Sequence, residues 1–199
     1  MRCEFKEASL ADSVIIYEFI NKHMPKFRSL DMIEDEFKND NYRTYLLLSK
    51  EHTDEPLSEL RKNKDKDNLK NLTNESTISI SIELDSACVA TDARLKGDNL
   101  HKRKILALIN FYISEDYKDL NLILVDKNFR NLGLAKKLFL YSLEKLMDIY
   151  PDVRQLNLEV SEKNEAAIKL YRSLGFKEYM RRNNYYGNNI AAILMSYIY

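Results

Sequence analysis

Residues 122–136 read LILVDKNFRNLGLAK, which places a short apolar run, a polar loop and the start of a helix in direct succession. The apolar run Leu122–Val125 is typical of a buried strand. Gly133 and Ala135 carry minimal side chains, so the backbone at the helix N-terminus can approach a bulky anion. The N–H groups and the helix dipole would both point at that anion. The stretch therefore predicts a site for a phosphate or pyrophosphate group.

Two common nucleotide-binding patterns, G-x-G-x-x-G and G-x-x-x-x-G-K-[ST], do not occur in the chain, which argues against a dinucleotide fold or a nucleoside triphosphatase. What remains is the pattern R-x-x-G-x-A, formed by Arg130, Gly133 and Ala135. This pattern resembles the acetyl-CoA signature of the GNAT superfamily of N-acetyltransferases.

The resemblance continues toward the C-terminus. The segments Leu158–Val160, Asn164–Tyr171 and Leu174–Phe176 match the second half of a GNAT domain in order and spacing. Residues 181–186, RRNNYY, resemble the tyrosine-bearing loop of protein N-terminal acetyltransferases. The match covers residues 105–199 well and residues 1–51 more loosely, and it leaves the segment between them uncovered.

The resemblance implies that acetyl-CoA binds against the strand end and the loop that follows it. The backbone of 123–125 would align the pantetheine arm and the acetyl carbonyl, and the loop would hold the pyrophosphate. The implied cofactor-binding residues are Ile123, Leu124, Val125, Arg130, Asn131, Leu132, Gly133, Leu134, Ala135, Lys136 and Asn164. No metal is expected, because the three histidines show no metal-ligand spacing and the two cysteines lie far apart.

The resemblance also assigns Glu159 as general base and Tyr171 as general acid. An α-ammonium has a pKa near ~8, so a carboxylate acting through water can supply the free amine, and a tyrosine hydroxyl can protonate a departing thiolate. Judged from the residues alone, Glu159 could be a solvated strand residue and Tyr171 a core aromatic. Tyr185 and Tyr186, implied to contact the substrate, could be an ordinary exposed pair.

The hydrophobic pattern predicts the surrounding elements. We expect strands at 45–48, 105–113, 120–125, 156–160, 176–180 and 190–197, and helices from Ser9–Asp12 to Pro25 and at 30–37, 134–147 and 165–174. The last helix is expected to begin at an Asn164 cap and to end at Gly175 in a Schellman motif, with Phe176 making its hydrophobic contact. The prediction is an α/β fold with helices on both faces of a mixed sheet, which the GNAT resemblance implies is splayed at its centre.

The length of 199 residues favours a single domain over residues 1–199. Residues 52–103 are expected to form a polar insertion before the third core strand, because Asp54–Asn74 is dense in Lys, Asp, Glu and Asn. Within it, Thr77–Glu83 alternates as a half-buried strand does.

Composition limits the partners. Lys plus Arg equals Asp plus Glu at 31 each, so the net field offers no pull toward nucleic acid or an anionic membrane. The apolar runs are far shorter than the ~20 residues that a membrane-spanning helix needs, and charged residues interrupt the N-terminus where a signal peptide would need an apolar core. We therefore expect a cytoplasmic protein that binds neither a membrane nor nucleic acid directly.

The expected activity is acetyl transfer from acetyl-CoA to the N-terminal α-amine of a protein or peptide. An auxiliary subunit or association with the ribosome is possible. Two alternatives stay open at this point. One is a GNAT enzyme acting on a lysine side chain or a small-molecule amine, since fold and cofactor do not determine the acceptor. The other is a catalytically silent acyl-CoA-binding subunit, which would need neither Glu159 nor Tyr171.

Overall fold

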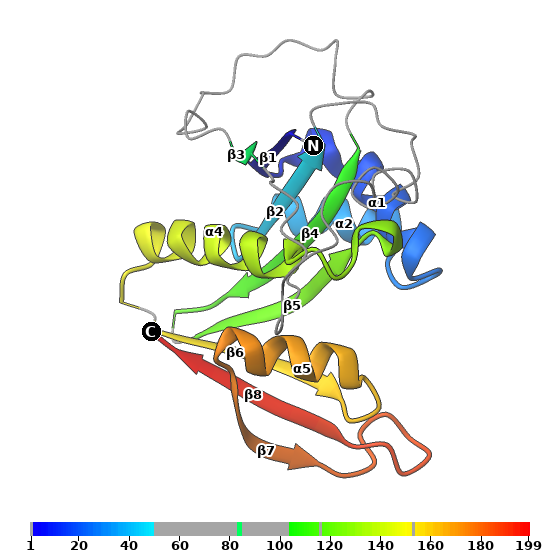
Figure 1. The fold of residues 1–199 in the computed structure, drawn as a ribbon, viewed down its shortest axis with the longest axis vertical. Helices are drawn as coiled ribbons and strands as arrows, with labels where there is room; N and C mark the ends of the chain where they lie inside the picture. Colours follow the sequence, from blue (N-terminus) through cyan, green and yellow to red (C-terminus); the bar gives the residue numbers. More distant parts are fainter. Residues whose placement is uncertain (1, 50–82, 85–103, 116, 153) are drawn as a thin grey trace, which may run out of the picture.

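The computed structural model describes residues 2–49, 83–84, 104–115, 117–152 and 154–199 (Figure 1). In chain order the elements are β1 (Arg2–Glu7), the short helix η1 (Leu10–Asp12), α1 (Ser13–His23), α2 (Leu30–Lys38), β2 (Tyr42–Ser49), β3 (Glu83–Leu84), β4 (Ile105–Ile113), β5 (Lys118–Val125), the short helix η3 (Lys127–Phe129), α4 (Leu134–Ile149), β6 (Gln155–Ser161), α5 (Glu165–Leu174), β7 (Lys177–Arg182) and β8 (Ala192–Ile198).

The strands form one eight-stranded sheet in the order β3-β1-β2-β4-β5-β6-β8-β7. Two neighbouring pairs are parallel, β1 with β3 and β5 with β6, and the other pairs are antiparallel. The predicted mixed sheet is therefore confirmed.

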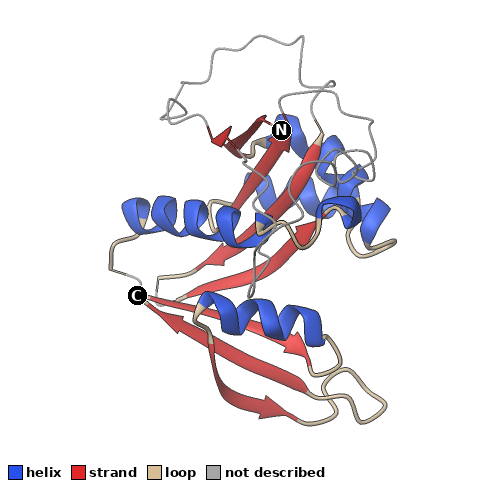
Figure 2. Ribbon diagram, in the orientation of Figure 1, coloured by secondary structure: helices blue, strands red, loops and turns tan. Residues whose placement is uncertain are grey.

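Helices cover both faces of this sheet, as predicted (Figure 2). Apolar side chains of α1 and α2, such as Ile16 and Ile33, pack with Leu122 and Leu124 of β5 on one face. On the other face, α4 and α5 pack against the strands through side chains such as Phe139 and Ile168. The two apolar layers hold β5 between them, so the position of its C-terminal end is well determined by packing.

The first strand, β1, is absent from the sequence-based prediction. It pairs with β2 from Cys3↔Ser49 to Glu7↔Tyr45. Its signal was the alternation of Cys3 and Phe5 with charged residues, a pattern typical of a half-buried strand. The run is so short that only its pairing with β2 makes it a stable element.

Most of the predicted insertion, including the strand expected at 77–83, lies outside the described residues. Its described part is β3, which pairs with β1 through Arg2↔Glu83 and Cys3↔Leu84. The assignment of residues 1–199 to a single domain with a polar insertion stays a prediction.

The sheet opens between β5 and β6. These strands pair only through Lys118↔Leu156 and Asp119↔Asn157, and beyond that point they diverge (Figure 1). Parallel strands that continued side by side would exchange hydrogen bonds along their whole length. The divergence leaves the β6-facing edge of β5 without that neighbour, which agrees with the expected central splay.

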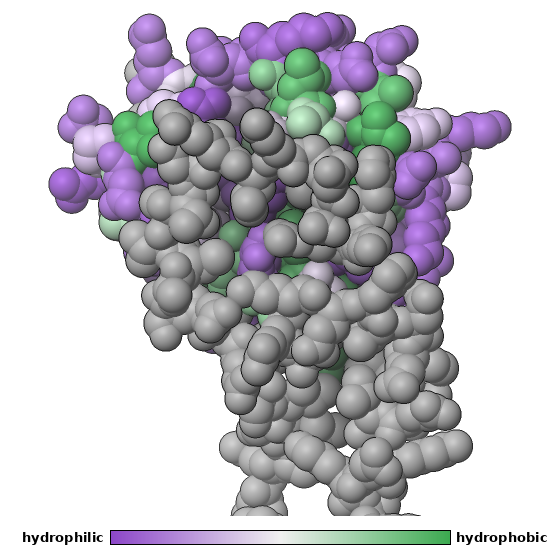
Figure 3. Space-filling model, turned by 90° about the horizontal axis from the view of Figure 1, so that it is seen from above, coloured by the Kyte–Doolittle hydropathy of each residue, from purple (hydrophilic) through white to green (hydrophobic). Residues whose placement is uncertain are grey.

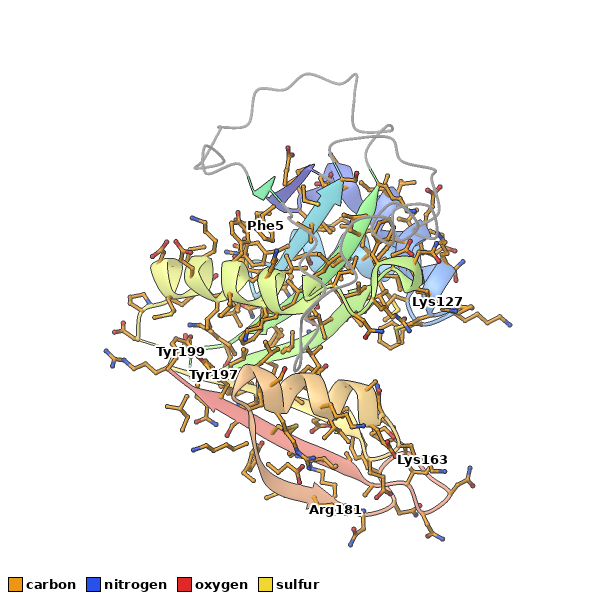
Figure 4. All side chains as sticks on the ribbon, viewed as in Figure 1. Phe5, Lys127, Lys163, Arg181, Tyr197 and Tyr199 are labelled. Carbon is orange, nitrogen blue, oxygen red and sulfur yellow. The ribbon has the colours of Figure 1, made fainter. Side chains whose placement is uncertain are left out.

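The closed end of this opening is held by a buried lysine. Lys118 is fully buried, and its ammonium group donates hydrogen bonds to the Tyr150 carbonyl oxygen, at 3.0 Å, and to the Tyr199 hydroxyl. Burial lowers the pKa of Lys118 to about 8. Tyr197 and Tyr199 lie here, at the C-terminal end of the chain (Figure 4). These bonds join β5 to the residues that follow α4 and β8. The strands β5 and β6 therefore stay together at this end and separate at the other.

None of the helices in the described part of the chain is long and apolar enough to cross a membrane. Seen from above, the described surface in view is mostly hydrophilic, with small hydrophobic areas between the polar side chains (Figure 3).

Candidate functional site

A pocket of about 480 Å³ lies across the closed end of the β5–β6 opening. Its lining residues come from β5 and the residue before it, from β6, and from β7 and β8: Tyr117, Asp119, Leu120, Asn121, Asn157, Leu158, Glu159, Tyr179, Arg182 and Leu194. Polar and charged side chains make up most of this list, so the pocket is suited to a polar ligand.

Glu159 is one of the pocket carboxylates, and the structure shows why it faces outward. Leu158 and Val160 belong to the core on the α4 and α5 side, and the alternation of a strand turns Glu159 to the other face. Its carboxylate accepts a hydrogen bond from the Arg182 guanidinium at 2.6 Å. About a third of the Glu159 side chain remains exposed, so one oxygen can still reach water or a substrate.

Tyr171 belongs to α5 and lies on the opposite face of β6, where its side chain is part of the core between α5 and the sheet. It is 8% exposed. Burial, with a smaller contribution from the neighbouring Tyr186, raises the pKa of Tyr171 to about 12. The hydroxyl is therefore protonated at neutral pH, which is the state that a proton donor needs.

The end of α5 holds Tyr171 in place. The Phe176 N–H donates to the Tyr171 carbonyl oxygen at 3.0 Å, and the Gly175 N–H donates to the Arg172 carbonyl oxygen at 3.1 Å. These two bonds form the predicted Schellman motif. Its hydrophobic contact joins Phe176 to Tyr171, with ring centroids 5.8 Å apart. Tyr171 is thus both a residue of the Schellman motif that ends α5 and the candidate general acid.

The raised pKa of Tyr171 predicts an alkaline stability effect. An unfolded tyrosine ionises near pH ~10, whereas Tyr171 stays protonated until about pH 12. Its contribution to stability is complete below pH ~10 and is lost as the pH rises toward 12. We expect the difference in unfolding free energy between the wild type and Tyr171→Phe to shrink by ~2 kcal/mol between pH 9 and pH 11.5, as measured by urea unfolding.

An exposed tyrosine, Tyr179, supplies the control for this measurement. The Tyr179→Phe variant should follow the wild-type curve across the same pH range. A constant difference between the wild type and Tyr171→Phe would mean that the Tyr171 hydroxyl is not desolvated in solution.

Tyr185 and Tyr186 lie in the loop between β7 and β8, and about half of each side chain is exposed. Their rings meet edge to face with centroids 5.1 Å apart, and the Arg182 guanidinium lies over the Tyr185 ring. Burial, then the charge of Glu159, raise the pKa of Tyr186. Tyr186 thus interacts electrostatically with Glu159, and it also contributes to the raised pKa of Tyr171.

The predicted phosphate loop follows β5 directly. Asp126 caps η3 by accepting a hydrogen bond from the Asn128 N–H at 2.9 Å. Asn131 and Gly133 then adopt left-handed conformations, with φ of 63° and 73°, and α4 begins at Leu134. The N-cap residue Gly133 has no side chain, so it cannot accept a hydrogen bond from the first N–H groups of α4. The helix N-terminus is thus available to an anion.

The space beside Gly133 is open among the described residues. A Cβ atom built at this position would have no heavy atom of the described residues within 4 Å. The left-handed backbone also disfavours any side chain here. Both observations agree with a backbone that a pyrophosphate could approach.

The remaining predicted cofactor residues lie around the same opening. Ile123, Leu124 and Val125 form the end of β5 beyond the point where β6 diverges. The Arg130 side chain folds back, and its Nε donates to the Val125 carbonyl oxygen at 3.3 Å. Asn164 caps α5 by accepting from the Ala167 N–H at 3.2 Å, as predicted. The loop residues Leu132, Leu134, Ala135 and Lys136 complete the set at the start of α4.

Several pocket residues were not singled out from the sequence. Asp119 and Asn121 flank Leu120 on β5, Tyr117 precedes that strand, and Tyr179 lies within β7. Asn121 lies at a bulge where the β4–β5 register shifts, and its amide donates to Asn110 at 3.3 Å. A polar residue inside the apolar run of β5 was the available signal.

Comparison with known proteins agrees with this geometry. The profile of the acetyltransferase (GNAT) family matches residues 30–176. The chain therefore belongs to the acetyltransferase (GNAT) family.

Two curated relatives resemble part of the chain. An N-alpha-acetyltransferase of Sulfurisphaera tokodaii is 35% identical over 74 residues, which are 37% of this chain and 44% of the relative. The [ribosomal protein bS18]-alanine N-acetyltransferase of Salmonella typhimurium is 44% identical over 64 residues, 32% of this chain and 42% of the relative. The chain thus matches less than half the length of each.

Solved structures share the fold over nearly the whole chain. The ribosomal-protein-S18-alanine N-acetyltransferase from Escherichia coli has a TM-score of 0.62 at 20% identity and covers 98% of this chain and 93% of its own. NAA60 of Arabidopsis thaliana, solved with a bisubstrate analogue, has a TM-score of 0.63 at 13% identity, with 98% and 97% coverage. At these low sequence identities, the structural similarity supports the assignment of the fold and does not establish the activity.

Proposed function

We propose that this protein transfers the acetyl group of acetyl-CoA to a primary amine, most favourably the N-terminal α-amine of a protein or peptide. The observation that carries the proposal is the opening between β5 and β6. The strand β5 leads into the loop with left-handed Gly133 at the start of α4, and a pocket lined by Asp119 and Glu159 lies at the closed end of the opening. One relative is named an N-alpha-acetyltransferase and another a [ribosomal protein bS18]-alanine N-acetyltransferase, which supports the choice of acceptor.

Acetyl-CoA would lie along the open edge of β5. The backbone groups of 123–125 would hold its pantetheine arm, and the loop and helix start at 130–136 would hold its pyrophosphate, with Asn164 nearby. Acetyl-CoA supplies an already activated thioester, so no covalent enzyme intermediate is needed.

Glu159 and Tyr171 would handle the protons. The acceptor amine loses a proton to Glu159 through a water molecule, because the amine must be neutral to attack. Tyr171 holds the proton that the leaving sulfur takes, and burial keeps that proton in place up to about pH 12. These residues lie on opposite faces of β6. A substrate could therefore reach both only in the opening, where β5 no longer pairs with β6.

Tyr185 and Tyr186 would contact the peptide that carries the amine. Arg182, which is hydrogen bonded to Glu159, lies over the Tyr185 ring, and aromatic side chains give a large contact area. A ribosomal-protein N-terminus belongs to this acceptor class, and one relative is named a [ribosomal protein bS18]-alanine N-acetyltransferase.

A peptide library incubated with the protein and acetyl-CoA tests the proposal. Mass spectrometry should find an added acetyl group on N-terminal amines, and peptides blocked at the N-terminus should remain unchanged. Acetylation of lysine side chains alone would identify a different acceptor. Binding of acetyl-CoA without transfer to any amine would favour a silent acyl-CoA-binding subunit.

A further inference from the structure

Asp119 is a second carboxylate in the candidate acceptor pocket. It lies on β5 opposite Asn157 of β6, in the last residue pair before the two strands diverge. Both Asp119 and Glu159 line the same pocket, one from each side of the junction. The pocket therefore presents two acidic groups at the point where the opening begins.

The charges around these groups do not balance. Three charged residues line the pocket: Asp119, Glu159 and Arg182. Arg182 is hydrogen bonded to Glu159 at 2.6 Å, so the guanidinium is committed to that carboxylate. The lining residues thus carry one negative charge in excess, which a cationic ligand would neutralise.

The surroundings of Asp119 point the same way. Burial, and then the negative charge of Glu159, raise the pKa of Asp119, while a hydrogen bond with the Asn157 side chain opposes them. A partly buried carboxylate in this position gains from a cation placed beside it. Tyr117 and Tyr179 line the same pocket, and aromatic surface is compatible with an ammonium group.

We propose that Asp119 binds the ammonium group of the acceptor and holds it beside Glu159 at the closed end of the opening. The inference rests on the proposed acetyltransferase function and extends it by assigning the residue that recognises the acceptor's charge. Asp119 keeps the protonated amine in the pocket, and Glu159 then receives its proton through water. An acceptor without a positive charge would lose this contact.

Binding of two matched peptides to Asp119→Asn tests the assignment. The first ligand is a peptide that the library shows to be acetylated, and the second is the same peptide with hydrogen in place of its α-amine. Calorimetry is done at pH 7 with CoA present, so that the amine is mostly protonated and no transfer occurs. Asp119→Asn should weaken binding of the amine peptide by ~10- to 100-fold, as expected for a lost hydrogen bond to a charged group.

The second peptide separates charge recognition from structural damage. Its affinity should be the same for the wild type and Asp119→Asn, and Asp119→Glu should recover much of the affinity for the amine peptide. Equal weakening of both peptides, or wild-type affinity of Asp119→Asn for the amine peptide, would overturn the proposal while leaving the proposed function intact. A wild-type protein that acetylates no amine would instead overturn the proposed function and this inference with it.

Discussion

Glu159→Gln and Tyr171→Phe should each lower turnover on an N-terminal peptide by ~10²- to 10⁴-fold, the usual contribution of a positioned acid or base. Gln keeps the shape of Glu159 but cannot accept the proton, and Phe keeps the packing of Tyr171 but has no proton to give. Binding of acetyl-CoA should remain close to that of the wild type, since neither group belongs to the phosphate loop. Steady-state kinetics and calorimetry measure the two quantities separately.

The ion pair between Arg182 and Glu159 requires a control. Arg182→Gln removes the same ion pair as Glu159→Gln but leaves the carboxylate in place. If the base is what matters, Arg182→Gln should retain much more activity than Glu159→Gln. The wild-type pH profile should also rise toward the pKa of the amine and flatten in Glu159→Gln. Full activity of both Glu159→Gln and Tyr171→Phe would refute their assignment and favour the acyl-CoA-binding alternative.

Gly133→Val should weaken acetyl-CoA binding by ~10²-fold or more. The new side chain enters the open space beside the loop, and it keeps the phosphate from the N–H groups of α4. Loss of two charge-assisted hydrogen bonds is sufficient for an effect of this size. Calorimetric titration of the folded variant with acetyl-CoA measures it.

Gly187 provides a matched control for the backbone effect. Its φ of 72° nearly equals the 73° of Gly133, and a Cβ atom there also meets no described atom within 4 Å. Gly187→Val therefore carries the same conformational strain in the loop between β7 and β8, away from α4. It should bind acetyl-CoA as the wild type does. Similar losses in both variants would attribute the effect to strain and remove the phosphate-loop assignment.

The local features of the site could be predicted from the sequence. The start of α4 after Gly133, the Asn164 cap and the Schellman motif at Gly175 all appear in the structure where they were expected. Caps, left-handed glycines and hydrophobic periodicity act within one or two helical turns. Short segments of sequence therefore contain the physical causes of these features.

Only the tertiary structure brings the pocket together. Arg182 reaches Glu159 from 23 residues away because β7 and β6 both pair with β8. Asp119 faces the same pocket because β5 and β6 meet for only two residue pairs and then separate. The pairing at the closed end depends on the buried Lys118, which joins β5 to Tyr150 after α4 and to Tyr199 after β8, and no local sequence pattern contains these long-range contacts. The sequence alone thus predicted most of the elements, though not β1, and the candidate phosphate loop, whereas long-range packing decided which charges share the candidate acceptor pocket.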